Sequence, residues 1–469
     1  MTAEPSVGAE VRARAALALE RALESKAPLP GLLDGARVLT APRDRGFLDE
    51  LVLGTLRWLR RLDSVLEQAA GRPMASVDRD LHSPLRLAAY QLLFLDRVPS
   101  YAAVNAAVEA VKGRSHRGAV GFANAILRKI ANRRDLAGWP VTVDDPIEAL
   151  AIETSYPTFV VRRWVDRFGA PAARAALADG NRRPGFQLLC FGDRGELAAA
   201  LGAEAVVVRP TPLAPLGLEV IAGDPRDTAP FRAGRLYIQD QASQAAALVP
   251  APAAGEQVLD VAAAPGGKSF SLLAAEPRVR LVAADSSLVR LRRLRANQAR
   301  LGIPFALAAA RAEAPSFRDG FDRVIADLPC SGTGTFARHP ELKWRVSESE
   351  LARLSGQGLD MLRAAAGVVC AGGLLCAITC SLEREENEDV VHGLMAERPD
   401  FTLEALELPA AMAPFVAGPG LWRTLPAADH DGFTVHVLRR DAVVSARFDT
   451  AARASLAKRR RKTARRSSS

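Results

Sequence analysis

The stretch Val258-Leu-Asp-Val-Ala-Ala-Ala-Pro-Gly-Gly-Lys-Ser269 decides the fold that we expect for this chain of 469 residues. Residues 258–261 form a short apolar run that contains an acid, which predicts a buried parallel strand. Pro265-Gly266-Gly267 predicts a tight turn, and a helical pattern follows over residues 270–275. A strand, a glycine turn and a helix in this order direct backbone N–H groups and the positive end of the helix toward a bound small molecule.

Three later segments repeat the pattern of an apolar strand with a reactive side chain at its end. Residues 281–285 and 321–327 end in aspartate, and residues 373–381 have Cys380 next to their last residue. In a doubly wound sheet the ligands lie outside the carboxyl ends of the strands. We therefore expect an α/β core with a doubly wound, Rossmann-like sheet. The reactive side chains at its carboxyl edge would be those of Asp260, Asp285, Asp327, Cys330 and Cys380.

The glycine turn lacks the features of two common phosphate-binding loops. A Walker loop needs a glycine five positions before Gly267, where this chain has Ala262, and the dinucleotide fingerprint G-x-G-x-x-G is absent. The turn instead suits a nucleoside with little or no phosphate, with Asp285 one βα unit later to hold ribose hydroxyls. S-adenosylmethionine fits this description. The alternative is a structural βα turn in some other α/β enzyme.

Composition indicates a protein of two to four domains with an ample hydrophobic core. No Arg-flanked apolar run opens the chain, and glycines interrupt the longest uncharged stretch, residues 364–382. Neither a signal peptide nor a membrane span is therefore predicted. Five cysteines without a repeating pattern favour a reducing cytoplasm and argue against disulfides and zinc, and we assign no metal.

The two ends of the chain differ in pattern. Residues 1 to about 135 are predicted to be helical because apolar residues recur three and four positions apart, and their basic residues lie off these stripes. Such basic residues form either a solvated face or a surface for a phosphate backbone. The last twenty residues hold eight basic residues and no acid, out of a net charge of +9. They predict a disordered tail that either raises affinity for polyanions or has no essential role.

Two cysteines follow predicted strands. Cys330 lies in Asp327-Leu-Pro-Cys-Ser-Gly-Thr-Gly334, and Cys380 lies in Thr379-Cys-Ser381. Either cysteine alone is most simply a small buried apolar residue, but two at one sheet edge, with Asp327 between them, favour activated thiols. A thiolate that adds to carbon 6 of cytosine makes carbon 5 able to accept a methyl group, and a carboxyl at the Watson–Crick edge would orient the base. These residues fit cytosine-5 methylation of a base that has left its stack.

Motifs between about residues 10 and 440 carry a family resemblance. The helical part has Gly54-Thr-Leu-Arg57, Ala103-Val-Asn-Ala-Ala-Val-Glu109 and Gly121-Phe-Ala-Asn-Ala-Ile-Leu-Arg128, which are similar to the NusB-type RNA-binding domain. The α/β part has Val258–Ser269, Asp327–Ser331, Arg338–Trp344, Thr379–Ser381 and Glu383–Asn387. Together these segments resemble the Sun (Fmu, RsmB-type) family of 16S ribosomal RNA cytosine-5 methyltransferases.

The resemblance implies a cytoplasmic, monomeric enzyme that uses S-adenosylmethionine and methylates 16S ribosomal RNA at the cytosine conventionally numbered 967. By motif position Cys380 is the nucleophile, Cys330 aids product release and Asp327 contacts the base. The implied cofactor-binding residues are Ala262, Ala263, Ala264, Pro265, Gly266, Gly267, Lys268, Asp285 and Asp327. The implied domains are a NusB-like bundle (1–140), a linker and small α/β domain (141–235), a Rossmann-like methyltransferase domain (236–440) and a disordered basic tail (441–469).

Three places depart from the family pattern. Ala262 stands where a cysteine is common, which we interpret as a packing change. The segment Gln187-Leu188-Leu189 lacks the arginine that is usual in this strand, so one RNA contact expected from the family is not predicted here. Residues 305–311 lack the usual acid after the third strand, so Glu313 or a backbone amide would have to replace it. Glu383, Glu385 and Glu386 are interpreted as favourable charges at a helix start, and Lys343-Trp344 either stacks on a base or pins the next helix.

The residues leave other functions open. One alternative is cytosine-5 methylation of DNA, in which the cysteine after Pro329 would attack, or of another RNA such as tRNA. Another is a non-catalytic RNA-binding factor for ribosome assembly or antitermination. The pair of cysteines and the intact glycine turn favour the ribosomal RNA enzyme over both.

Overall fold

The computed structural model describes residues 7–25, 27–112, 115–312, 317 and 320–442. The chain forms two compact units: unit 1 is Met1–Arg183 with Phe336–Arg345, and unit 2 is Pro184–Thr335 with Val346–Ser469. The chain thus leaves unit 2 after Thr335, contributes a short segment to unit 1 and returns at Val346. Compact units can hold more than one domain, so the boundaries expected at 140, 235 and 440 stay predictions. The basic stretch 458–466 and Glu313 lie outside the described residues.

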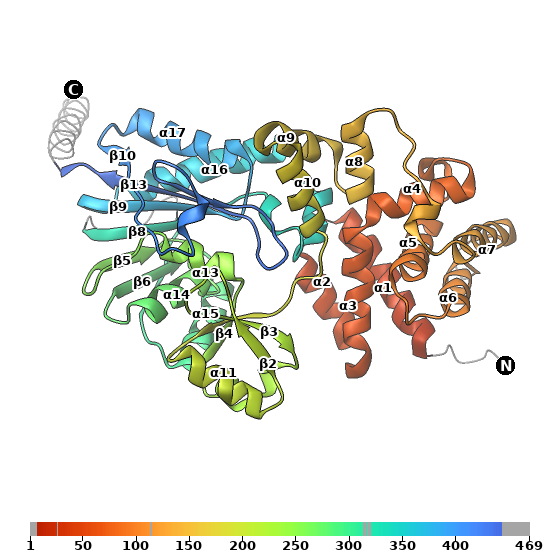
Figure 1. The fold of residues 1–469 in the computed structure, drawn as a ribbon, viewed down its shortest axis with the longest axis horizontal. Coiled ribbons are helices and arrows are strands. Elements are labelled where there is room, and N and C mark those ends of the chain that lie inside the picture. The colour runs from red at the N-terminus through yellow and green to blue at the C-terminus, as the bar shows by residue number, and fades with distance from the viewer. Residues whose placement is uncertain (1–6, 26, 113–114, 313–316, 318–319, 443–469) are drawn as a thin grey trace, which may run out of the picture. The chain divides into compact units, whose positions relative to one another are not determined.

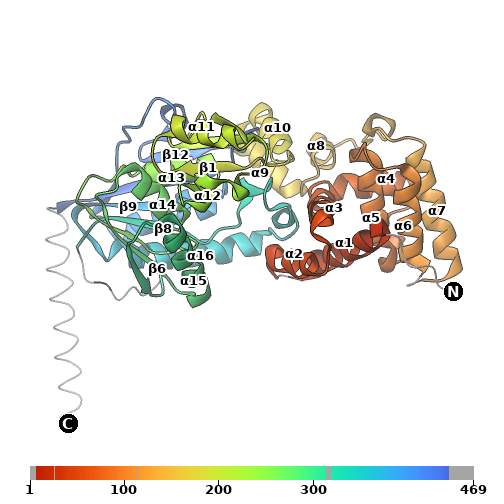
Figure 2. The ribbon, with the colours of Figure 1, turned by 90° about the horizontal axis from the view of Figure 1, so that it is seen from below.

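Unit 1 is built from helices, which confirms the helical prediction for the N-terminal region (Figures 1 and 2). They are α1 (Val7–Glu24), α2 (Leu29–Val38), α3 (Arg45–Arg57), α4 (Leu59–Ala70), α5 (Arg79–Phe94), α6 (Ser100–Lys112), α7 (Arg117–Ala131), α8 (Pro146–Thr154), α9 (Thr158–Phe168) and α10 (Ala170–Asp179). Short 3₁₀ turns lie at η1 (Pro42–Asp44), η2 (Met74–Ser76), η3 (Leu136–Gly138) and η6 (Pro340–Trp344).

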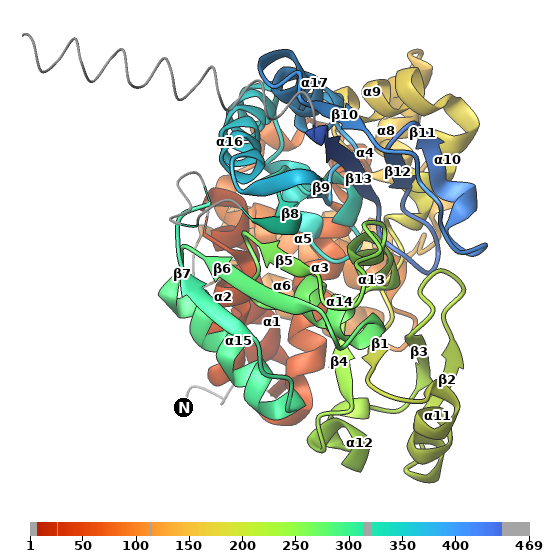
Figure 3. The same ribbon diagram turned by 90° about the vertical axis from the view of Figure 1, so that its left-hand side faces the viewer.

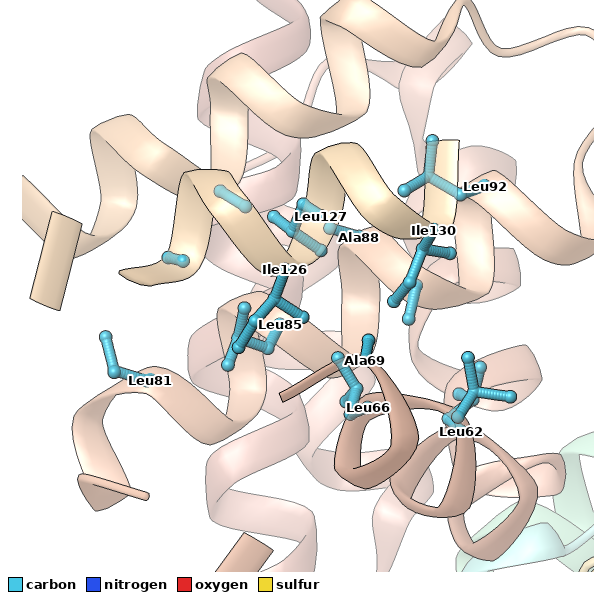
Figure 4. Close-up of a cluster of buried hydrophobic side chains, with 14 of the residues drawn as sticks. Leu62, Leu66, Ala69, Leu81, Leu85, Ala88, Leu92, Ile126, Leu127 and Ile130 are labelled. Atoms are coloured by element: carbon cyan, nitrogen blue, oxygen red, sulfur yellow. The ribbon is translucent and has the colours of Figure 1, made fainter. Parts of the chain in front are cut away.

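A buried apolar cluster holds α4, α5 and α7 together. The residues that point toward one another in Figure 4 are Leu62, Leu66 and Ala69 of α4, Leu85, Ala88 and Leu92 of α5, and Ile126, Leu127 and Ile130 of α7. Their spacing of three and four places them on one face of each helix. Each buried leucine or isoleucine contributes about 1.5–3 kcal/mol, so the apolar stripes seen in the sequence account for the packing of these helices.

Unit 2 begins with a small antiparallel sheet in the order β2-β3-β1-β4. Its strands are β1 (Gln187–Cys190), β2 (Val207–Pro210), β3 (Gly217–Ala222) and β4 (Leu236–Ile238), with α11 (Arg194–Ala203) and α12 (Ala229–Arg232) beside them. Gln187 is buried, its Oε1 accepts the N–H of Gln241 at 2.7 Å, and its Nε2 donates to the carbonyl of Asp429. Gln187 therefore ties the small sheet to the rest of unit 2 and does not face solvent.

The large sheet of unit 2 follows the order β11-β12-β13-β9-β8-β5-β6-β7, and β10 pairs with β13 (Figure 3). Its strands are β5 (Gln257–Asp260), β6 (Arg280–Asp285), β7 (Ala306–Ala309), β8 (Phe321–Asp327), β9 (Val369–Thr379), β10 (Phe401–Leu403), β11 (Val416–Gly418), β12 (Leu421–Thr424) and β13 (Phe433–Arg440). Strands β7, β6, β5, β8 and β9 are neighbours in this order, and each adjacent pair is parallel. The pairs β9–β13, β13–β12, β12–β11 and β13–β10 are antiparallel.

Helices cover both faces of this sheet. α13 (Gln241–Leu248), α14 (Gly267–Ala275) and α15 (Leu288–Leu301) pack on one face, and α16 (Glu348–Ala366) and α17 (Glu388–Glu397) pack on the other. This arrangement confirms the doubly wound, Rossmann-like fold. The chain order reverses at β5, which pairs with both β6 and β8. Ligands bind at such a switch point, so the loops after β5 and β8 are the expected place for a site.

Candidate active site

A glycine that other residues cannot replace shapes the loop after β5. Gly266 has a φ of 113°, and a Cβ built there would lie 2.4 Å from both the Leu294 Cδ1 and the Phe270 Cε2 atoms. α14 begins at the next residue, Gly267. Because residues 266 and 267 carry no side chain, this turn brings the N-terminus of α14 to the sheet edge, where such helix ends bind ligands.

Asp285, at the end of β6, holds the same loop. Its Oδ2 accepts the N–H of Ala264 at 3.3 Å, and its Oδ1 accepts the N–H of Ser287 at 2.8 Å. The guanidinium of Arg290 lies 2.9 Å from Oδ1 and covers the carboxylate, which is fully buried, whereas the Arg290 side chain is 54% exposed. Asp285 thus bonds two backbone N–H groups and one exposed guanidinium, and its proposed contact with ribose hydroxyls stays a prediction.

Asp260, the last residue of β5, is also buried. Its Oδ2 accepts the hydroxyl of Ser269 at 2.7 Å, but its Oδ1 has no hydrogen-bond partner of good geometry among the described residues. Burial raises the pKa of Asp260 to about 6, and the bond from Ser269 offsets only part of that rise. A buried acceptor without a partner is costly, so a donor on a bound molecule would stabilise this carboxylate.

Lys268 of α14 pairs with Asp327, the last residue of β8. The Nζ–Oδ2 distance is 2.7 Å, and the ammonium also lies 5.7 Å from the centroid of the Phe433 ring. Burial opposes the charge on Lys268, but the neighbouring carboxylates of Asp327 and Asp260 outweigh it and raise the pKa of Lys268. The pair joins the β5 and β8 loops, and it leaves the Asp327 side chain 37% exposed beside a fixed cation.

The structure brings Cys330 and Cys380 together. Cys330 lies three residues after β8, and Cys380 follows β9 directly; the two strands are parallel neighbours. Their sulfur atoms lie 3.5 Å apart, and both thiols are free and half-buried. The hydrogen bond with Cys380, burial and the charge of a Cys380 thiolate raise the pKa of Cys330 well above its ordinary value. Cys330 is therefore a neutral thiol near pH 7.

A buried carboxyl, Glu386, links the two cysteine loops. Its Oε1 accepts the N–H of Ser331 at 2.7 Å, and its Oε2 accepts the Ser331 hydroxyl at 2.6 Å. It also bonds the side chain of Ser381, and burial raises its pKa to about 7. Ser331 follows Cys330 and Ser381 follows Cys380, so one carboxyl fixes the residue next to each cysteine. The interpretation of Glu386 as a favourable charge at a helix start does not include this contact. Its partner Ser331 lies 55 residues earlier in the chain, so no local sequence pattern connects the two residues.

Further hydrogen bonds stiffen the same two loops. The N–H of Gly334 donates to the carbonyl of Cys380 at 2.9 Å, and the N–H of Leu382 donates to the Thr333 hydroxyl at 2.9 Å. Asn387 donates to the carbonyls of Ser381 and Glu383 at 3.1 and 2.7 Å. Because each loop is bonded to the other, the distance between the two sulfur atoms is set by the fold.

The residues around the β5 loop fit the nucleoside cofactor expected from the sequence. Small side chains and glycines make up Ala262–Gly267, the Asp260 Oδ1 atom lacks a partner of good geometry among the described residues, and Asp285 lies at the end of the neighbouring strand. The roles of Ala262–Lys268, Asp285 and Asp327 toward the cofactor stay predictions. In the ranges that the structure describes, no group of three or more His, Cys, Asp or Glu side chains is placed to hold a metal ion. No helix within those ranges is long and apolar enough to cross a membrane.

Comparison with known proteins gives two family matches. Residues 9–132 match the NusB family, and residues 247–439 match the family described as 16S rRNA methyltransferase RsmB/F. The probable ribosomal RNA small subunit methyltransferase B of Bacillus subtilis (strain 168) is 34% identical over 411 residues, which cover 85% of this chain and 91% of that protein. Ribosomal RNA small subunit methyltransferase B of Vibrio cholerae is 31% identical over 400 residues, which cover 84% of this chain and 91% of that protein.

Solved structures share the fold. The crystal structure of PH0851 has a TM-score of 0.74 at 24% identity and covers 93% of this chain and 99% of its own. NSun6 from Pyrococcus horikoshii has a TM-score of 0.52 at 20% identity and covers 60% of this chain and 97% of its own.

The RsmB/F match spans the part of unit 2 that carries the glycine turn and both cysteines. The curated relatives extend this similarity to the helical region. S-adenosylmethionine is the methyl donor of such enzymes, in agreement with the fit of the β5 loop. The chain therefore belongs to the RsmB/F family of S-adenosylmethionine-dependent 16S rRNA methyltransferases.

Proposed function

We propose that this protein methylates carbon 5 of a cytosine in 16S ribosomal RNA, at the family position 967, through a covalent bond between Cys380 and the base. The observation that carries the proposal is the 3.5 Å separation of the Cys330 and Cys380 sulfur atoms beside the Lys268–Asp327 ion pair. Relatives named small subunit methyltransferase B support the choice of RNA. Two adjacent thiols support carbon as the methylated atom, since an amine or hydroxyl substrate needs no thiol adduct.

Cys380 starts the reaction. Its thiolate adds to carbon 6 of the cytosine, an S–C6 bond forms, and the ring electrons move toward N3 and O2. Asp327 accepts a hydrogen bond from the exocyclic amine and orients the base, while Lys268 offsets the negative charge that builds on N3 and O2. S-adenosylmethionine, when bound, supplies the electrophilic methyl group that carbon 5 of this adduct accepts.

Cys330 completes the reaction because adduct formation changes its environment. In the free protein, the hydrogen bond and the electrostatic interaction with Cys380 raise the pKa of Cys330. Once the Cys380 sulfur is bonded to carbon 6 it carries neither proton nor charge, so the pKa of Cys330 falls. The Cys330 thiolate then removes the proton from carbon 5, the electron pair of that C–H bond forms the C5–C6 double bond, and the S–C6 bond breaks to release the Cys380 thiolate.

Methyl transfer to unmodified 16S ribosomal RNA tests this function. With a tritiated methyl donor, we expect Cys380→Ala to abolish incorporation and Cys330→Ala to accumulate an RNA–protein adduct that survives denaturation. Cys370→Ala is the matched control, because Cys370 lies near the start of β9, at the other end of the strand from Cys380. Bisulfite sequencing locates the modified cytosine. Unchanged incorporation by Cys380→Ala, or a methyl group on another atom, would reject the proposal.

The location and the oligomeric state belong to the same proposal. A ribosomal RNA substrate supports a cytoplasmic enzyme, and the resemblance implies a monomer. Fractionation of cells and analytical ultracentrifugation of the purified full chain test these two points separately. Recovery with the membrane fraction would contradict the first, and a dimer at micromolar concentration would contradict the second.

A further inference from the structure

Helix α15 has a charge pattern that the chemistry of the active site does not use. Its residues, Leu288–Leu301, include five arginines and no acid. Leu291, Leu294 and Leu301 are buried in the core below the helix. Figure 3 shows the helix running along β6 and β7 on the outside of the sheet. Its outward face therefore carries a cluster of positive charge between residues 290 and 295.

Three of these arginines have no counter-charge. Arg290 pairs with Asp285, and Arg300 donates to the carbonyls of Phe231 and Leu236 at 3.0 Å. The other three are exposed and form no ion pair or hydrogen bond with any residue that the structure describes: Arg292, Arg293 and Arg295.

Many other arginines of unit 2 are neutralised by neighbouring acids. Examples are Arg278 with Glu276, Arg353 with Glu350, and Arg363 with Asp360 and Glu397. Like charges three or four positions apart on a helix destabilise it. The cluster on α15 differs from these ion-paired positions, and the repulsion within it is a cost to the free protein that an anionic partner would reduce.

The geometry of the cluster suits a nucleic acid backbone. Residues 292 to 295 cover about 4.5 Å of the helix axis, so the three positive charges are concentrated within one turn of the helix. Leu288 and Val289, at the start of the helix, are each 61% exposed and offer apolar surface beside the guanidinium groups. α15 begins three residues after Asp285, which holds the glycine loop of the active site.

We propose that the outer face of α15, formed by Arg292, Arg293 and Arg295 with Leu288 and Val289, binds the sugar–phosphate backbone of the ribosomal RNA substrate. Arginine forms paired hydrogen bonds with phosphate, and neutralising a polyanion releases its counterions. α15 belongs to the same compact unit as both cysteines, so RNA held on this face stays attached to the body that carries out the chemistry. The inference rests on the family activity and not on which atom of the RNA is methylated.

A charge-matched pair of triple variants of the full chain tests this surface. Arg292→Gln/Arg293→Gln/Arg295→Gln removes the unpaired charges, and Arg278→Gln/Arg353→Gln/Arg363→Gln removes the same charge from ion-paired positions. The probe is unmodified 16S ribosomal RNA transcribed in vitro. At about 150 mM salt we expect the α15 variant to bind at least roughly tenfold more weakly, and the slope of log affinity against log salt to shrink by about 2 to 3. The control variant should change affinity by less than about twofold.

Two further measurements separate RNA binding from folding. Calorimetry with S-adenosylmethionine should give the same affinity for the α15 variant and the parent protein. Hydrogen exchange of the unmodified protein should show residues 288–301 protected when RNA is added, which requires no variant. Equal loss of affinity in both triple variants, an unchanged salt slope, or no protection of α15 would overturn the inference. None of these results would alter the role of Cys380, which adduct formation tests independently.

Discussion

The sulfur atoms of Cys330 and Cys380 lie 3.5 Å apart, although 50 residues separate them in the sequence. Two thiols at this distance in a partly buried site do not both ionise readily, because the charge of one thiolate opposes that of the other. The contact with Cys380 therefore holds Cys330 as a neutral thiol in the free protein. This coupling leads to the first of four predictions.

Replacing Cys380 should lower the pKa of Cys330. Cys380→Ala removes the hydrogen bond and the negative charge that raise this pKa most directly, and it leaves only burial and more distant carboxylates. We expect the pH midpoint for alkylation of Cys330 by iodoacetamide to fall by at least about one unit. Peptide mapping by mass spectrometry separates Cys330 from the other cysteines. Cys370→Ala is the control, and an unchanged midpoint in Cys380→Ala would contradict the coupling.

Glu386 should act as a positioning residue for both cysteines. Glu386→Ala removes the acceptor for the N–H and the hydroxyl of Ser331, so the two loops lose their common partner. We expect methyl transfer to fall by about a hundredfold, in line with the effect of small misplacements of reacting groups, with most of the loss in kcat. Glu386→Gln keeps one acceptor oxygen and should recover part of the rate. A rate of alkylation at Cys330 and Cys380 equal to that of the parent would argue against a positioning role.

Glu397→Gln on α17 is the control for Glu386, since the contact of Glu397 among the described residues is an exposed ion pair with Arg363. It should leave methyl transfer within about twofold of the parent, because exposed ion pairs contribute little.

The charge on Glu386 should also make stability depend on pH. Its pKa is raised by burial to about 7 in the folded protein, against roughly 4.3 in an unfolded chain. Between these values the folded state holds a proton that the unfolded state has released, so the free energy of unfolding falls as pH rises and the loss is complete above about pH 7. Glu386→Gln removes this dependence. Its melting temperature, relative to the parent, should increase from pH 5 to pH 8; a constant difference would contradict this assignment.

Gly266 should tolerate no side chain. Gly266→Ala combines a backbone φ of 113° with a Cβ that meets Leu294 and Phe270 at 2.4 Å. We expect a loss of about 2–4 kcal/mol in the free energy of unfolding and weaker binding of S-adenosylmethionine, because strain and overpacking act together. Gly302→Ala is the matched control: its φ is 66°, and nothing lies within 4 Å of the added Cβ. It should lose only about 1 kcal/mol. Equal melting temperatures for the two variants would refute the steric argument.

Local patterns in the sequence were enough to predict the helices of unit 1 and the strand–turn–helix after β5. Apolar spacing of three and four reflects the period of a helix, and an apolar run that ends in an acid before glycines reflects a buried strand followed by a turn. Because parallel strands end at one edge, the order of these patterns also predicted that Asp260, Asp327 and Cys380 would lie near one another.

The environment of Lys343 is one that local sequence patterns do not predict. Its place beside Trp344 favoured stacking on a base as much as a structural role, yet it is fully buried in unit 1. Its ammonium contacts the carbonyls of Arg57 and Ser155 at 3.2 and 3.4 Å and lies 3.6 Å from the centroid of the Tyr156 ring. Trp344 donates to the carbonyl of Leu56 at 2.8 Å. The hydrogen-bonded partners are 188 to 288 residues away along the chain, so no spacing rule identifies them.

By itself, then, the sequence determined the α/β fold class, the glycine turn and the set of reactive residues, since each depends on neighbours a few positions apart. Only the tertiary structure decided that the two sulfur atoms are in contact and that Glu386 bonds the residue beside Cys330. It also decided that Arg292, Arg293 and Arg295 find no counter-charge among the residues that the structure describes. Those features depend on the order of strands in the sheet and on which side chains meet across it. Such long-range contacts are selected by the packing of the whole core, and a linear pattern does not encode them separately.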